Sequence, residues 1–378
     1  MNDIVVENRG MRLLTAFGIL MVVAGHVDLN AFDVGELFPY YSFHVFIFLF
    51  VTGYFYKPEY ESGVIPFIKK KFRNLLLPYL LWNLAYGILA ELLNWVGFEF
   101  GQGLSVQTLF LAPFNTGHQY ILNQAAWFVP VLFALETVYC ILRVLIKKIA
   151  GKAFVEKAVY EWGLLILLLL AGGGIVSQSQ RGHIWGYDLL PGRIGFMIPG
   201  IQMGRLYHRC LEERDRAGDL IYFTVLLAVQ AVICQVNENI SFSTAWVNGF
   251  GGSVALPYIT VGTGIAFWLR ISKILACSPR VAEGLMPIGR YSFAIMMHHL
   301  LGIFLLNLFF CFNPAVFPDF DRELFRKYID CIYLPGGKET VKWIYFCMAM
   351  AVPSVIVWSG NKIRKLADSQ FDNCLRMH

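Results

Sequence analysis

Residues 160–178 read YEWGLLILLLLAGGGIVSQ, and this stretch decides the fold class. It carries one charged side chain, Glu161, close to its start. In a helix with a rise of about 1.5 Å per residue, a stretch of this length reaches across the roughly 30 Å hydrocarbon core of a bilayer. The stretch therefore predicts a transmembrane helix.

The rest of the chain has the same character. Of its 378 residues, 57% are hydrophobic and 15% are charged, whereas soluble domains average about 45–50% and about 25%. We expect one domain, residues 1–378, folded as an all-α polytopic membrane helix bundle with about ten transmembrane helices. The predicted spans are 12–31, 40–57, 74–96, 126–147, 160–178, 189–207, 218–236, 252–270, 287–312 and 340–361.

The sixth predicted span, 189–207, is rich in helix-breaking residues. Broken helices are tolerated at membrane depth where protein or a water-lined cavity satisfies the backbone. The span is therefore either a broken helix that lines a cavity or a continuous helix that is merely bent. The residues concerned are Pro191, Gly192, Gly195, Pro199, Gly200 and Gly204.

Most of the 31 lysines and arginines fall in alternate loops. Basic loops stay in the cytoplasm, so we expect both termini to be cytoplasmic. The net charge of +5 then reflects inner loops that meet anionic lipid, and we expect no nucleic-acid partner. The eight cysteines form no CxxC pair, so we expect no metal.

Two polar side chains mark the first span. His26 lies about 21 Å beyond Arg12 along the helix and on nearly the same face. An ionisable residue within a span is by default a functional candidate, and a neutral imidazole is suited to act as a general base. The alternative is a structural histidine that bonds to a neighbouring helix.

Three further side chains lie in spans or at their ends. We expect His44 at the same outer level as His26, and Trp127 opens the fourth span at the outer face. His299 follows His298 in the ninth span, and neighbours on a helix point about 100° apart, so at most one faces a given cavity. We expect all three side chains to contact the substrate. The alternative role for His44 and Trp127 is interfacial anchoring.

A basic cluster precedes the third span and consists of Lys69, Lys70, Lys71 and Arg73. It is first an orientation signal. The same side chains are also suited to hold the phosphates of a nucleotide-like molecule from the cytoplasm.

Taken in order, these segments resemble the membrane-bound acyltransferase-3 family, the integral-membrane O-acyltransferases of polysaccharides and lipids. The resemblance covers about residues 10–360. It rests on Val22-Val23-Ala24-Gly25-His26, Ser42-Phe43-His44…Gly53-Tyr54, Arg73…Leu77-Pro78-Tyr79, Trp127-Phe128…Pro130 and Gly289…Ser292…Ile295…His299.

The resemblance implies transfer of an acyl group, commonly acetyl, from cytoplasmic acyl-CoA to a hydroxyl of an extracytoplasmic glycan or lipid-linked sugar. His26 would act as general base or as acyl carrier. Where the family has an arginine eleven residues before this histidine, the chain has Thr15. Arg12 lies one turn lower on nearly the same face, and we expect it to take over the catalytic role of that arginine. We expect a multi-pass protein of the bacterial cytoplasmic membrane that serves the cell envelope.

Two alternatives use the same scaffold. One is a transporter or flippase of a small polar solute or lipid-linked sugar, which a broken sixth span would suit. The other is a structural partner in a glycan-assembly complex.

Overall fold

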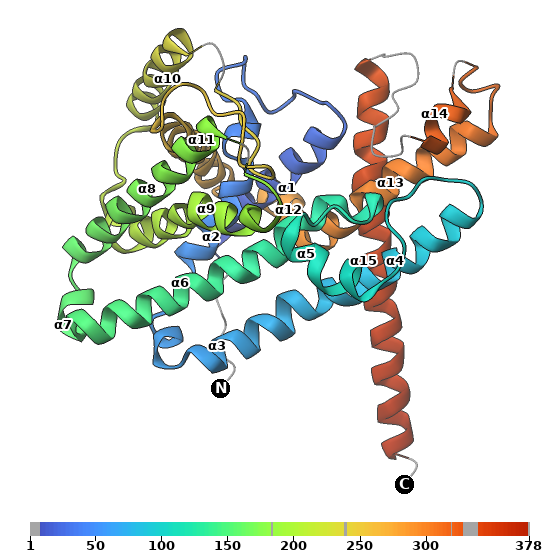
Figure 1. The fold of residues 1–378 in the computed structure, drawn as a ribbon, viewed down its shortest axis with the longest axis horizontal. Helices are drawn as coiled ribbons and strands as arrows, with labels where there is room; N and C mark the ends of the chain where they lie inside the picture. Colours follow the sequence, from blue (N-terminus) through green and yellow to red (C-terminus); the bar gives the residue numbers. More distant parts are fainter. Residues whose placement is uncertain (1–7, 183, 238–239, 319, 328–338, 377–378) are drawn as a thin grey trace.

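The computed structural model describes residues 8–182, 184–237, 240–318, 320–327 and 339–376, and these ranges are helical with no β-strand (Figure 1). The α-helices are α1 (Arg9–His26), α2 (His44–Tyr54), α3 (Val64–Lys71), α4 (Leu77–Trp95), α5 (Ala112–Asn115), α6 (Phe128–Ala150), α7 (Lys152–Val155), α8 (Ala158–Arg181), α9 (Leu189–Leu206), α10 (Asp219–Val236), α11 (Leu256–Ala276), α12 (Pro279–Arg290), α13 (Ser292–Phe312), α14 (Arg322–Lys327) and α15 (Glu339–Arg376).

Helices occupy all ten predicted stretches. Seven helical runs within the described residues are long and apolar enough to cross a membrane. The total of about ten spans and the cytoplasmic placement of both termini stay predictions. The seven runs are Val64–Trp95, Ile121–Ala150, Ala158–Arg181, Asp219–Val236, Leu256–Ala276, Ser292–Phe312 and Val341–Lys362.

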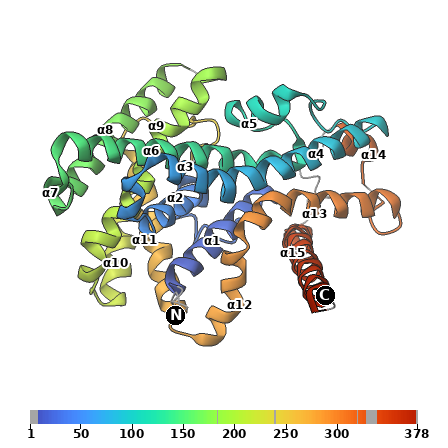
Figure 2. The ribbon, with the colours of Figure 1, turned by 90° about the horizontal axis from the view of Figure 1, so that it is seen from below.

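The helices α1 and α9 are not among these seven runs, and protein surrounds both of them. Of the 18 residues of α1, 13 are buried, and the helix packs against α2, α11, α12 and α13 (Figure 2). In α9 even Arg193, Gln202 and Arg205 are buried. A helix that other helices enclose does not need the uniformly apolar surface that lipid demands.

The sixth predicted span is one continuous helix, α9, which runs through Pro199 without a break. Two of its glycines, Gly200 and Gly204, serve close packing against α2. A Cβ on Gly204 would lie 1.8 Å from the Phe50 carbonyl oxygen, and one on Gly53 would lie 1.7 Å from the Ile201 carbonyl oxygen. The two backbones therefore touch at this crossing, as small residues permit in membrane bundles.

Three boundaries differ from the sequence prediction. The helix α2 has only 11 residues because Phe43 is not helical, with φ −147°. The third span extends back to Val64 through a π-helical turn, Phe72–Leu76. The ninth predicted span is divided at Tyr291, where α12 ends and α13 begins.

Candidate functional site

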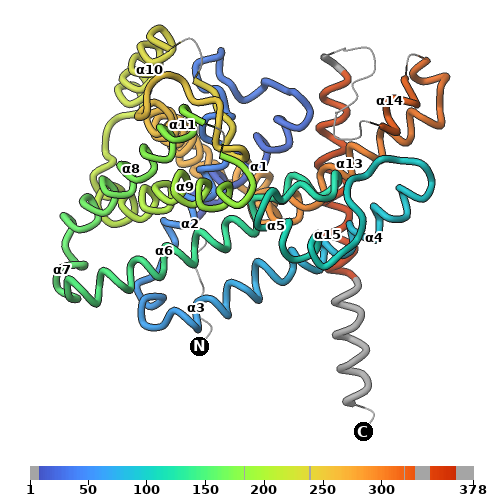
Figure 3. Tube along the Cα trace, in the orientation of Figure 1, coloured from blue at the N-terminus to red at the C-terminus, as the bar shows by residue number. Residues whose placement is uncertain are grey.

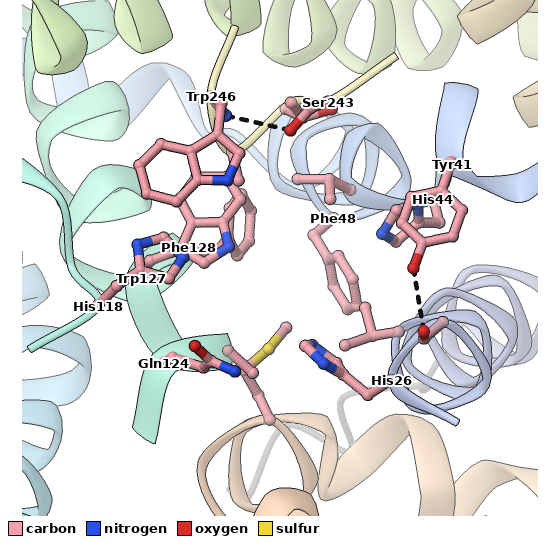
Figure 4. Close-up of a pocket in the computed structure, with 17 residues that line it drawn as sticks. His26, Tyr41, His44, Phe48, His118, Gln124, Trp127, Phe128, Ser243 and Trp246 are labelled. Carbon is pink, nitrogen blue, oxygen red and sulfur yellow. Dashed lines mark hydrogen bonds between the residues drawn. The ribbon is translucent and has the colours of Figure 1, made fainter. Parts of the chain in front are cut away.

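Helix ends and two loops enclose a cavity of about 310 Å³ (Figure 4). His26 enters it from the last residue of α1, His44 from the first residue of α2, and Trp127 from the turn before α6. The structure thus brings three of the predicted site residues together. All three lie on the side that the sequence predicts to be extracytoplasmic.

The imidazole of His26 is half-buried at the cavity wall. Neither ring nitrogen has a hydrogen-bond partner in the part of the chain that the structure describes. The neighbouring residue is Gly25, whose carbonyl accepts a hydrogen bond of 3.0 Å from the Tyr41 hydroxyl. A Cβ on Gly25 would lie 2.9 Å from that hydroxyl oxygen, so glycine gives Tyr41 the room to close this wall.

His299 lies beside His26, with ring centroids 5.0 Å apart. Its Nδ1 is 2.8 Å from the Ile295 carbonyl, and its buried Nε2 has no hydrogen-bond partner among the described residues. His298 points elsewhere, with Nδ1 2.9 Å from the Tyr86 hydroxyl. The sequence predicts that at most one of the two adjacent histidines faces a given cavity, and neither is among the residues that line this one.

Backbone carbonyls fix the tautomers of His44 and His299. His44 Nδ1 lies 2.7 Å from the Tyr40 carbonyl oxygen. A carbonyl can only accept a hydrogen bond, so Nδ1 carries the proton in both rings and Nε2 keeps its lone pair. His44 therefore presents a hydrogen-bond acceptor in the cavity wall.

A buried arginine lies behind Trp127. The guanidinium carbon of Arg193 is 4.5 Å from the centre of the Trp127 ring, and the side chain of Arg193 is fully buried. In this position the cation fixes the indole through its π face. Trp127 is thereby held in the cavity wall as a rigid aromatic surface.

Arg12 is not near His26. It lies at the other end of α1, where Nη1 is 3.4 Å from the carbonyl oxygen of Gly289 at the end of α12. Thr15, the residue at the family's arginine position, is buried and bonds to the Met11 carbonyl at 2.9 Å. The structure therefore separates the two predicted catalytic residues.

The basic cluster lies at the end of α3 and in the π-helical turn that follows. Lys69, Lys70 and Arg73 are exposed. Lys71 instead bonds to Glu136 of α6 at 2.5 Å, and only 5% of the Glu136 side chain is exposed. Three of the four predicted cations are thus available to a ligand, whereas Lys71 neutralises a buried carboxylate.

A buried ion network lies near this cluster. Glu161 is completely buried, 3.0 Å from Arg143 and 2.8 Å from Arg209, and Gln202 donates to it at 2.8 Å. Arg143 also bonds to Glu61 at 2.6 Å. The network joins the ends of α6, α8 and α9, so the basic side of the bundle is held together by charge.

Three cavity residues escaped the sequence analysis: Gln124, His118 and Trp246. His118 and Trp246 lie in loops, where hydropathy carries no signal. Arg193 also escaped, although an arginine inside a predicted span is itself a signal of function.

The comparisons with known proteins agree with this picture. A family model described as an acyltransferase domain matches residues 8–359, nearly the whole chain. No curated protein and no solved structure gives a significant match.

Proposed function

Because the chain belongs to the acyltransferase-3 family, we propose that it transfers an acyl group, most simply acetyl, from cytoplasmic acyl-CoA to a hydroxyl of an extracytoplasmic glycan or lipid-linked sugar. The observation that carries the proposal is the unpartnered imidazole of His26 in a cavity on the expected outer side. A general base needs a free ring nitrogen that an acceptor hydroxyl can reach.

The chemistry balances with His26 alone as the proton carrier. A ring nitrogen takes the proton of the acceptor hydroxyl while the oxygen bonds to the thioester carbonyl carbon. The carbon–sulfur bond then breaks, and the leaving thiolate receives the proton from His26. In the other route, the ring nitrogen bonds to the thioester carbonyl carbon and the carbon–sulfur bond breaks, which releases the thiolate. The acceptor oxygen then bonds to the same carbon, the carbon–nitrogen bond breaks, and the hydroxyl proton passes to the thiolate.

Donor binding is proposed at the basic cluster. Lys69, Lys70 and Arg73 are exposed on the expected cytoplasmic side, where they are suited to hold the phosphates of coenzyme A. The adjoining π-helical turn Phe72–Leu76 supports this assignment, since such turns occur frequently at functional sites.

A broken sixth span would have suited the transporter alternative. Since α9 is continuous through Pro199, this observation no longer favours a carrier, and the family membership favours group transfer.

The test uses the full chain, purified in detergent and supplied with acetyl-CoA labelled in the acetyl group and a panel of methyl glycosides. We expect label on an acceptor and a loss of at least about a hundredfold in His26→Ala. His208→Ala is the matched control, because His208 is an exposed histidine beside Glu212. Transfer at the wild-type rate in His26→Ala would remove the assignment, and acetyl-CoA-independent counterflow of an unmodified glycoside in vesicles would support the carrier.

A further inference from the structure

The cavity offers polar groups that are free to bind a ligand, and none of them carries a fixed charge. No Asp, Glu, Lys or Arg occurs among the described residues that line it. The amide of Gln124 has no hydrogen-bond partner among those residues, and His44 presents a bare Nε2. Neutral donors and acceptors between aromatic walls suit a ligand with hydroxyl groups.

His118 adds a second acceptor. Its Nδ1 lies 2.7 Å from the Thr116 carbonyl oxygen, so Nε2 carries the lone pair. Burial lowers the pKa of His118 to about 4, against the opposing effect of the Thr116 hydrogen bond and with help from the Arg193 charge. The ring is therefore neutral at physiological pH, and its Nε2 accepts a hydrogen bond there.

Trp246 supplies a donor. Its ring is stacked between His118, at a centroid distance of 4.5 Å, and Trp185, at 5.1 Å. Both faces are thus covered, and the indole N–H has no partner among the described residues. Figure 4 shows the edge of Trp246 that carries this N–H turned toward the middle of the cavity.

Residues 240–255, which precede α11, hold Trp246 in place. Figure 3 shows this segment folded back over the ends of α8 and α9. The Val247 carbonyl accepts a hydrogen bond of 2.5 Å from Ser179 of α8. Val247 is completely buried and has a φ of +49°, in the left-handed region.

Arg193 of α9 ties this segment to the loop that carries His118. Its Nε donates to the Ala245 carbonyl at 2.8 Å, and its terminal nitrogens donate to the Asn115 and Thr116 carbonyls at 3.3 and 3.1 Å. The described residues offer it no carboxylate. The planar guanidinium group of Arg193 therefore fixes the positions of both loops. A lysine is unable to do this, because its ammonium group is a single point charge on a flexible stem.

We propose that His118, Trp246 and Gln124 select the acceptor by binding a neutral, hydroxyl-bearing ring, and that Arg193 is the positioning residue for this wall. The inference rests on the proposed function and assigns its acceptor subsite. It predicts discrimination against an acceptor ring that bears a carboxylate, because a carboxylate in this cavity would be desolvated without a cation at the wall to pair with it.

The experiment measures transfer from acetyl-CoA to methyl glucoside and to methyl glucuronide, in which a carboxylate replaces the C6 hydroxymethyl group. Methyl xyloside, which lacks C6 altogether, is the control for loss of the C6 hydroxyl and is expected to be accepted better than the glucuronide. We expect the glucoside to be the better acceptor by at least about tenfold in kcat/KM. Trp246→Phe keeps the stacked ring and loses the N–H. His118→Asn keeps the donor to Thr116 and loses the Nε2 acceptor. Each change is expected to raise the KM for the glucoside about tenfold, as loss of one hydrogen bond does, without changing the Kd for acetyl-CoA.

Trp95→Phe and His208→Asn are the controls, because both side chains are exposed and neither lines the cavity. Unchanged glucoside KM in both cavity variants, or preference for the glucuronide, would overturn the inference while leaving the acyltransferase intact. Absence of transfer by the wild-type protein to every glycoside would instead count against the proposed function. An unchanged Kd for acetyl-CoA shows that a variant is folded.

Arg193→Lys tests the positioning role. We expect the glucoside KM to rise while kcat at saturation stays within about threefold of wild type, because the loops loosen but His26 is untouched. A side chain that only supported the fold would weaken acetyl-CoA binding and kcat together, and that result would refute the role of Arg193.

Discussion

His299 lies against His26 with its ring centroid 5.0 Å away, and the bond from its Nδ1 to the Ile295 carbonyl leaves a bare, buried Nε2 beside that ring. The lone pair on Nε2 of His299 favours the protonated form of the His26 ring over its neutral form. We infer that His299 stabilises the imidazolium that His26 becomes when it takes the acceptor's proton.

The first prediction concerns this pair. His299→Asn keeps a donor for the Ile295 carbonyl and removes Nε2, so we expect kcat to fall about 10–100-fold with little change in either KM. Steady-state kinetics measure both constants. His298→Asn, which keeps the donor or acceptor for Tyr86, is the control and is expected to stay near wild type. Wild-type kcat in His299→Asn would exclude the pairing.

The second prediction concerns the donor. Replacement of Lys69, Lys70 and Arg73 by Gln is expected to raise the KM for acetyl-CoA at least about tenfold and to leave the acceptor KM unchanged. The wild-type donor KM is also expected to rise with salt, since these cations are exposed and screened. The control is Lys148→Gln, which changes an exposed lysine of α6, outside the basic cluster. An equal effect from Lys148→Gln would point to general surface charge.

The third prediction concerns Glu161. Glu161→Gln leaves Arg143 and Arg209 without this buried carboxylate, so we expect the free energy of unfolding to fall by about 3–5 kcal/mol. Glu156→Gln removes an exposed pair with Lys152 and is expected to cost less than about 1 kcal/mol. Denaturant unfolding in detergent compares the two, and similar losses would contradict the structural role of Glu161.

The fourth prediction concerns the crossing of α2 and α9. Gly204→Ala places a Cβ against the Phe50 carbonyl, so the helices have to separate and we expect a clear loss of stability. Gly163→Ala meets nothing within 4 Å in α8 and is expected to stabilise by up to about 1 kcal/mol. If the two backbones touch as described, Gly204→Ala lowers the Tm of the protein and Gly163→Ala raises it in thermal unfolding.

The fifth prediction concerns Arg12. Because it bonds to Gly289 at the end of α12, we expect Arg12→Ala to lower stability by about 1 kcal/mol and to leave kcat nearly unchanged. Thr15→Ala is the companion variant, with a similar expectation. A large loss of kcat in Arg12→Ala at unchanged stability would instead support the catalytic role of Arg12 that the sequence predicts.

The helices themselves are readable from the sequence, because apolar length is a local property. Glu161, the one charge in the stretch 160–178, shows the limit of such reading: hydropathy places the helix, yet the partners Arg143 and Arg209 come from other segments. The length of α2 also escaped prediction, since it depends on the backbone of Phe43.

The candidate site was readable in part. His26, His44 and Trp127 share an end of the bundle because alternating helix directions bring those positions together, and this follows from the order of the spans. Trp246 and His118 meet only because Arg193 ties two loops that are far apart in the sequence. No local pattern encodes such a meeting.

The left-handed backbone of Val247 has an evolutionary consequence. A β-branched residue held at positive φ costs on the order of 1–3 kcal/mol. The turn that contains Trp246 and Val247 therefore holds a backbone conformation that valine disfavours. Glycine at this position would relieve the backbone strain and would also let the neighbouring Trp246 side chain adopt more than one position. Selection for stability alone would therefore favour a protein with lower selectivity for its acceptor.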